Sequence, residues 1–205
     1  MLRSFCGGIL AVTLLAGAAS TSAAQETGTP IFKAPYRTFT AHELGASFSD
    51  PGEGVSFALE GFYRYGHGPY DLSIRGGFED LNGSAGTRYL FGANARTQIL
   101  TYSESFPLDG AFTLGIGANV GDGTDSYFIP IGISLGRRFN LEGSNTTFVP
   151  YLHPILGPAF GGGDSRVDAA LGLGVDVRFS EDLALRVSGG VGDIEGVGIS
   201  LAYIR

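Results

Sequence analysis

The chain contains little cysteine, lysine and charge, and each shortage excludes a class of protein. Its one cysteine, Cys6, lies in an N-terminal segment that we expect to be removed, so a disulfide-stapled secreted domain is excluded. Lys33 is the sole lysine among 13 basic residues, which are outnumbered by 20 acidic residues to give a net charge of -7. Because nucleic-acid binding needs clustered positive charge, we expect no nucleic-acid partner.

Long hydrophobic runs are also scarce. Beyond residue 24, no apolar run approaches the roughly 20 residues that a transmembrane helix requires. The earlier run, Ile9 to Ala16, follows a basic start and precedes small residues, which is the pattern of a secretory signal peptide. We therefore expect a signal peptide over 1–24, a periplasmic tail over 25–37 and one folded domain over 38–205. Any membrane insertion by the mature chain has to use strands.

Most of the mature chain alternates apolar residues with polar or small ones at every second position. These stretches end at turn signals such as Asn82-Gly83. Helical spacing is nowhere sustained. Ten candidate strands result, at 38–49, 55–66, 70–78, 88–96, 112–120, 127–136, 148–160, 171–179, 183–191 and 197–203. An even number suits an up-and-down barrel. Eight strands result if the weakly patterned first stretch and the proline-rich seventh stretch both drop out.

The seventh stretch is apolar on both faces and carries Pro150, Pro154 and Pro158. In an antiparallel strand, residues of one parity direct their backbone groups toward the same neighbour, so all three prolines would remove donors from one seam. Two interpretations stay open: a strand that borders an interrupted seam, which we favour, or extended chain packed across the barrel end.

The residues of the opposite parity indicate whether the apolar face of the sheet contacts lipid or a protein core. They are mainly glycine, alanine, serine and asparagine, in a chain with 34 glycines and only 16% charged residues. A solvated exterior normally carries many more charges, whereas small residues suit the crowded interior of a narrow barrel. We therefore expect the apolar face to contact lipid and the charged minority to form a paired polar network in the lumen. That network is predicted to contain Glu60, Arg64, Asp71, Arg75, Arg88, Arg96, Asp176, Arg178 and Arg186.

With its signal peptide, the tight turn "FSEDLALR" at 179–186 and the terminal strand "GVGISLAYIR", the chain resembles the small outer-membrane β-barrel families, including the transmembrane domain of outer membrane protein A. Barrels of this kind commonly finish with an aromatic residue, whereas this chain ends Tyr203-Ile204-Arg205. The resemblance implies an all-β, antiparallel, up-and-down transmembrane barrel, inserted by the barrel assembly machinery into the bacterial outer membrane. Counting ten strands from a periplasmic N-terminus, we expect the short turn at 180–182 to face the periplasm.

We expect a monomeric structural barrel or a narrow, porin-like pore for small solutes, in contact with outer-membrane lipid. One alternative is a soluble secreted or periplasmic barrel that binds a hydrophobic ligand inside. Another is an outer-membrane hydrolase of lipid or peptide, which would need His42 or His153 beside serine and an acid. No such grouping is evident in the sequence, and neither a catalytic residue, a metal site nor a cofactor is expected.

Overall fold

In the computed structural model, which describes residues 32–37, 39–52, 54–83 and 86–205, every regular element is a strand. The strands are β1 His42–Asp50, β2 Val55–His67, β3 Tyr70–Leu81, β4 Thr87–Leu100, β5 Asp109–Gly121, β6 Ser126–Phe128, β7 Ile131–Gly136, β8 Phe139–Asn140, β9 Thr147–Gly161, β10 Asp164–Arg178, β11 Leu183–Gly192 and β12 Gly196–Ile204. All pairings are antiparallel, and most join strands that are neighbours in the chain. The exceptions are β1–β12, β5–β7, β6–β9 and β7–β9. Within the described part, no helix is long and apolar enough to span a membrane.

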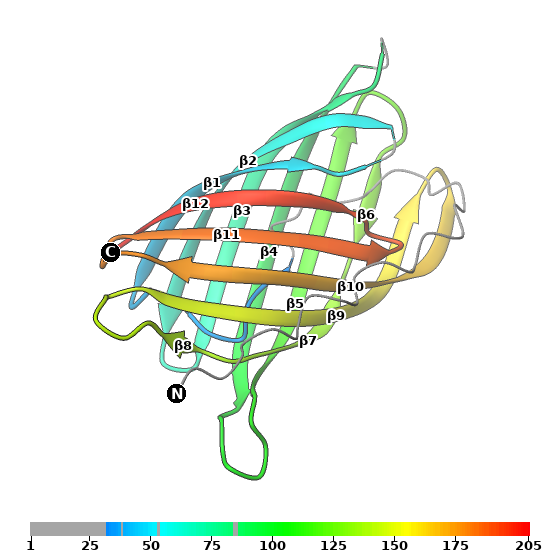
Figure 1. Ribbon diagram of the computed structural model, residues 1–205. Helices are drawn as coiled ribbons and strands as arrows, with labels where there is room; N and C mark the ends of the chain where they lie inside the picture. The colour runs from blue at the N-terminus through cyan, green and yellow to red at the C-terminus, as the bar shows by residue number, and fades with distance from the viewer. Residues whose placement is uncertain (1–31, 38, 53, 84–85) are drawn as a thin grey trace, which may run out of the picture.

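The sheet closes into a barrel because β1 pairs with β12 along eight registered positions, from Glu43↔Ile204 to Asp50↔Val197. β6 and β7 both lie between β5 and β9 and act as one wall strand that is interrupted at Ile129 and Pro130. β8 pairs only with β9, beyond the end of β7. The wall therefore has ten strands, as the alternation predicts, and not eight (Figure 1).

One end of the barrel carries the start of β1 and the end of β12, and we call it the terminal end. The turns β2–β3, β4–β5 and β10–β11 lie at this end, and the β4–β5 connection extends well past the wall (Figure 1). We call the opposite end, with the turns β1–β2, β3–β4, β9–β10 and β11–β12, the loop end.

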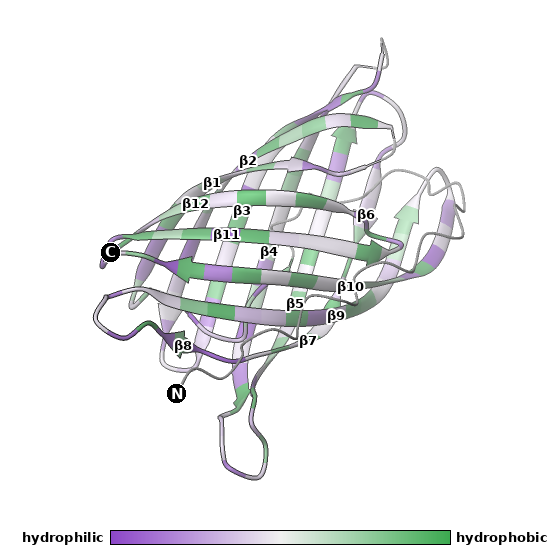
Figure 2. Ribbon diagram, in the orientation of Figure 1, coloured by the Kyte–Doolittle hydropathy of each residue, from purple (hydrophilic) through white to green (hydrophobic). Residues whose placement is uncertain are grey.

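Alternate residues of each strand point inward, and the polar parity is the inward one. On β1, Glu43 is 1% exposed while its neighbour Leu44 is 61% exposed. On β3, Glu79 is fully buried, while Ile74 is 62% exposed on the outer surface. Figure 2 shows the resulting residue-by-residue alternation of hydrophobic and hydrophilic colour along the wall strands. The barrel is thus apolar outside and polar inside, the inverse of a soluble β-barrel.

Candidate functional site

The lumen contains part of the chain itself, because residues 32–37 run inside the barrel. Phe32, Lys33 and Ala34 are each at most 3% exposed. The Lys33 amide donates a hydrogen bond to Nδ1 of His153 on β9 at 3.1 Å, and its Nζ donates to Oγ of Ser73 on β3 at 2.6 Å. This corrects the expectation of a periplasmic tail over 25–37 for the described residues 32–37. Residues 25–31 lie outside the part of the chain that the structure describes.

This luminal segment, residues 32–37, runs from the loop-end half of the lumen to the terminal end. Phe32 packs with Ile194, from the turn between β11 and β12, and a Cβ atom on Gly172 or Gly190 would overlap its ring. Glycine at these two positions therefore makes the room that the ring occupies. At the other end, Arg37 donates to the carbonyls of Gly68 and Tyr70 at the β2–β3 turn, both at 2.8 Å.

One buried arginine holds the middle of the luminal segment. Arg96 on β4 donates to the carbonyls of Ala34 and Tyr36, the second at 2.7 Å, and it also pairs with Asp71 on β3 at 2.5 Å. Arg96 thus connects the wall to the segment with charge-assisted hydrogen bonds, which are stronger than neutral ones.

Around the segment, the inner wall carries a chain of buried ion pairs. Glu43 pairs with Arg64 at 3.4 Å and with Arg186, and Arg186 also pairs with Asp176 at 3.0 Å. Further pairs join Arg75 to Glu60 at 3.5 Å and Arg88 to Glu79. No side chain in these pairs is more than 8% exposed. Since buried charges are costly unless paired, this arrangement lets a narrow lumen contain several arginines.

Strand register explains which acid meets which arginine. Glu43 lies directly opposite Arg64, Asp71 opposite Arg96, Glu79 opposite Arg88 and Asp176 opposite Arg186. Opposite residues of an antiparallel pair have their Cβ atoms about 5 Å apart, which is within reach of an ion pair. The network is therefore made mostly of cross-strand neighbours.

Eight of the nine predicted network residues are buried in ion pairs, and Arg178 is not. These eight are Glu60, Arg64, Asp71, Arg75, Arg88, Arg96, Asp176 and Arg186. Arg178 is the last residue of β10, and its guanidinium donates to the carbonyls of Ser180 at 3.1 Å and Glu181 at 2.8 Å, so it holds the β10–β11 turn. The prediction was wrong for Arg178 because inward parity at a strand end leads to the rim instead of the lumen.

Sequence reasoning missed Glu43 and Glu79, although both have the inward parity of their strands. Glu43 was hidden by the weak pattern of the first stretch, and Glu79 by its place beside a turn. Lys33 could not be found from periodicity, because the segment around it has none.

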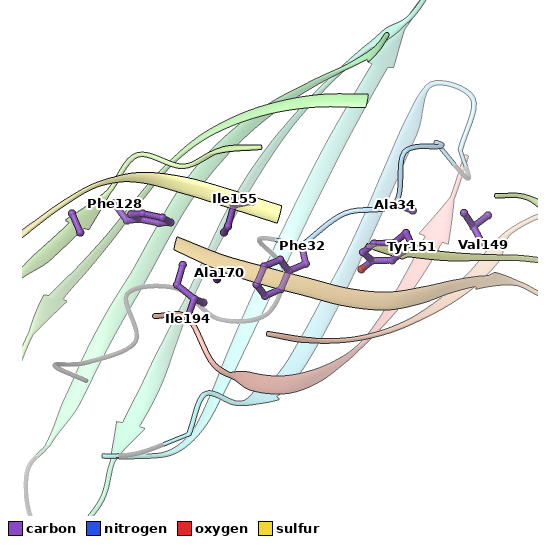
Figure 3. Packing of buried hydrophobic residues seen from close by; sticks show 9 residues of the cluster. Phe32, Ala34, Phe128, Val149, Tyr151, Ile155, Ala170 and Ile194 are labelled. Carbon is purple, nitrogen blue, oxygen red and sulfur yellow. The ribbon is translucent and has the colours of Figure 1, made fainter. Parts of the chain in front are cut away.

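The β9 side of the lumen is apolar. Val149, Tyr151, Ile155 and Ala159 of β9 form a buried cluster with Phe32 and with residues of β6 and β10 (Figure 3). The lumen thus has a charged side along β1 to β4, β10 and β11 and an apolar side along β9, with the luminal segment between them.

His153 is the polar exception on β9. Its Nδ1 accepts the Lys33 amide, so its Nε2 carries the proton and donates to Oγ1 of Thr113 at 2.8 Å. In this tautomer the ring is not available to take a proton from the Thr113 hydroxyl. His42, at the terminal end, contacts the Tyr63 hydroxyl at 2.7 Å. Among the described residues, no group of His, Cys, Asp and Glu has the arrangement of a metal site.

The seam between β9 and its neighbours β6 and β7 is incomplete. Pro158 accepts a hydrogen bond from the Ile129 amide at 3.1 Å, and Pro150 accepts one from the Arg137 amide at 3.3 Å. Because the N–H and C=O of one residue in an antiparallel strand face the same neighbour, the donors that these prolines lack would also have faced this seam. Pro154 has the same parity. On the other side, β9 pairs with β10 along its whole length, from Gly161↔Asp164 to Thr147↔Arg178.

A cavity of about 330 Å³ lies at the terminal end of the luminal segment, between Tyr36, Arg37, Arg96 and Arg138. The Arg138 guanidinium lies 4.3 Å from the centre of the Tyr36 ring, and the Tyr36 hydroxyl donates to Asp109. Burial and the Asp109 carboxylate raise the pKa of Tyr36 to about 12, so this hydroxyl keeps its proton at neutral pH.

The described structure is therefore a closed, ten-stranded antiparallel barrel with an apolar outer face and a lumen filled by ion pairs and by its own chain. Comparison with solved structures gives a similar fold, the beta domain of the Bordetella autotransporter BrkA, with a TM-score of 0.51 and 14% sequence identity over 80% of this chain and 98% of that chain. No family model and no curated protein sequence matches the chain.

Proposed function

We propose that the protein is an outer-membrane β-barrel with a structural role, whose lumen is closed at rest by residues 32–37 and the ion pairs around them. The observation that carries the proposal is the inverted polarity of the wall, with large apolar side chains outside and buried charges inside. An apolar band of this kind is stable against hydrocarbon and costly against water. The similarity to an autotransporter beta domain supports the same placement.

The closed lumen favours the structural role over an open, porin-like pore. Arg96 ties the wall to the carbonyls of Ala34 and Tyr36, and the Phe32 ring packs against Gly172 and Gly190. A solute path would have to displace this segment. A soluble barrel with a hydrophobic ligand inside would need an apolar interior, whereas buried ion pairs line this lumen along β1 to β4, β10 and β11.

Cell fractionation tests the location, because the protein is expected in the outer-membrane fraction and to be released only by detergent. On a gel, the unboiled protein is expected to migrate differently from the boiled protein, as folded membrane barrels do. Release of the folded protein by osmotic shock alone would refute the proposal.

Planar-bilayer recording tests the closed lumen. Wild-type protein is expected to give almost no steady conductance. Arg96→Ala should give frequent openings, because it frees the luminal segment, while Arg178→Ala, the matched control at the rim, should behave as wild type. A steady wild-type conductance that Arg96→Ala leaves unchanged would show that the segment does not close the lumen.

A further inference from the structure

The seam between β7 and β9 is the weakest part of the wall. No pairing forms between Ile133 of β7 and Pro154 of β9. The nearest paired positions on either side are Gly132↔Ile155 and Leu135↔Leu152. Pro154 cannot donate to the Ile133 carbonyl, and Pro150 and Pro158 leave the same defect on either side. A carbonyl without a donor in a hydrocarbon environment costs several kcal/mol, so the strands gain less by staying together here than at a complete seam.

Apolar surface continues through the wall at this seam. On the outer side, a groove of about 330 Å³ lies between Phe112, Ile131 and Leu156 and reaches the inward residues Gly132 and Ile155. On the inner side, Ile155 belongs to the buried cluster that includes Phe32 (Figure 3). Gly132 contributes no side chain to the wall between them, and a Cβ atom there would come within 2.7 Å of Ile155 Cγ2.

A second groove on the outer surface shows what is particular to this seam. That groove, of about 500 Å³, lies over the small residues Ala93 and Ala95 of β4. Both neighbours of β4 pair with it continuously there, from Leu72↔Ala95 to Ile74↔Ala93 and from Ala93↔Ile116 to Ala95↔Leu114. This groove also reaches inward residues, namely Ser73, Asn94 and Gly115, but they belong to continuously paired strands and two of them are polar. It is therefore a hollow over an intact wall.

We propose that the groove over the β7–β9 seam is a binding site for the acyl chain of a membrane lipid, which lies in the groove and contacts Ile155 beside the missing hydrogen bond of Pro154. The proposal rests on the membrane placement proposed above. An extended hydrocarbon chain suits the groove because its lining is apolar and includes Ile155. Paired strands about 4.8 Å apart leave no room for such a chain, so it reaches Ile155 only where the seam opens beside Pro154. A strand from another protein does not fit, since β7 and β9 still pair on both sides of Pro154 and leave no free edge.

Photolabelling of the wild-type protein tests the site. The protein is reconstituted in vesicles of phosphatidylcholine that carries a diazirine on one acyl chain, irradiated and mapped by peptide mass spectrometry. We expect label on outward residues such as Leu156 and Val187, and also on Ile155, the inward residue behind the seam. Val149, an inward residue of the same strand that is 1% exposed, should stay unlabelled.

Three outcomes decide between the proposals. Label on Ile155 that falls at least threefold in Pro154→Ala, which restores the missing donor, supports the acyl-chain site. Label on Leu156 and Val187 but not on Ile155 overturns this site and leaves the membrane barrel standing. No label on the outward residues overturns the site together with the proposed membrane placement.

A fluorescence measurement provides an independent readout, because the chain has no tryptophan. Single variants Ile155→Trp, Val149→Trp and Leu156→Trp are compared in vesicles with brominated acyl chains, after a gel confirms that each is folded. Quenching at position 155 close to that at 156 supports the site. Quenching at 155 no greater than at 149 overturns it.

Discussion

Glu43 is the residue on which the ion-pair network depends most, and its replacement gives a quantitative test. Its carboxylate is the partner of both Arg64 and Arg186, and its side chain is fully buried. Glu43→Gln keeps the shape but removes the charge, so it takes away the cross-strand acid of Arg64 and one of the two acids that pair with Arg186. Removing one partner of a buried pair typically costs about 3 to 5 kcal/mol, and we expect a loss in that range.

The loss is measured as a change in the free energy of unfolding, from urea titrations of protein in vesicles. The folded fraction is read from the gel shift between boiled and unboiled samples. Glu181→Gln is the matched control, because Glu181 is exposed in the β10–β11 turn and its change should stay within about 0.5 kcal/mol.

A double-mutant cycle separates the free energy of the Glu43–Arg64 ion pair from the effect of each substitution on packing. If Glu43 and Arg64 stabilise each other, Glu43→Gln with Arg64→Gln should cost less than the two single changes added together. A loss below about 1 kcal/mol for Glu43→Gln, with additive single changes, would refute the reasoning. It would mean that water reaches these charges and that the lumen is not closed.

The remaining predictions concern the space and the hydrogen bonds of the wall. Gly172→Ala should lower the free energy of unfolding by about 1 to 3 kcal/mol, because its Cβ overlaps Phe32, whereas the outward Gly61→Ala should be nearly neutral in the same urea titration. Pro154→Ala should raise the urea midpoint by restoring a donor to the seam, and a lower midpoint would contradict the hydrogen-bond argument. Arg178→Ala should change the free energy of unfolding by less than about 1 kcal/mol, since it affects only the β10–β11 turn.

The barrel and its strands could be predicted because their signal is local. Alternation along β2, β3 and β12 marks the inward residue of each pair in the sequence itself, since side chains alternate across any strand. The face of small, sparsely charged residues indicated that this side of the sheet lines the lumen and that the apolar side faces outward. The parity of the three prolines placed their missing hydrogen-bond donors on one seam. Arg178 shows the limit of this reasoning, because parity does not say how deep in the barrel a residue lies.

What the sequence by itself determined is therefore the kind of wall: a barrel of amphipathic strands, ten in the favoured interpretation, with an apolar outer face and charged residues on the inner face. The tertiary structure decided which acid meets which arginine, because Glu43 and Arg186 are 143 residues apart and meet only once register and closure are set. It also decided what fills the lumen. Residues 32–37 have no periodicity, and their place inside depends on Arg96, His153 and two glycines that come together only when the barrel closes.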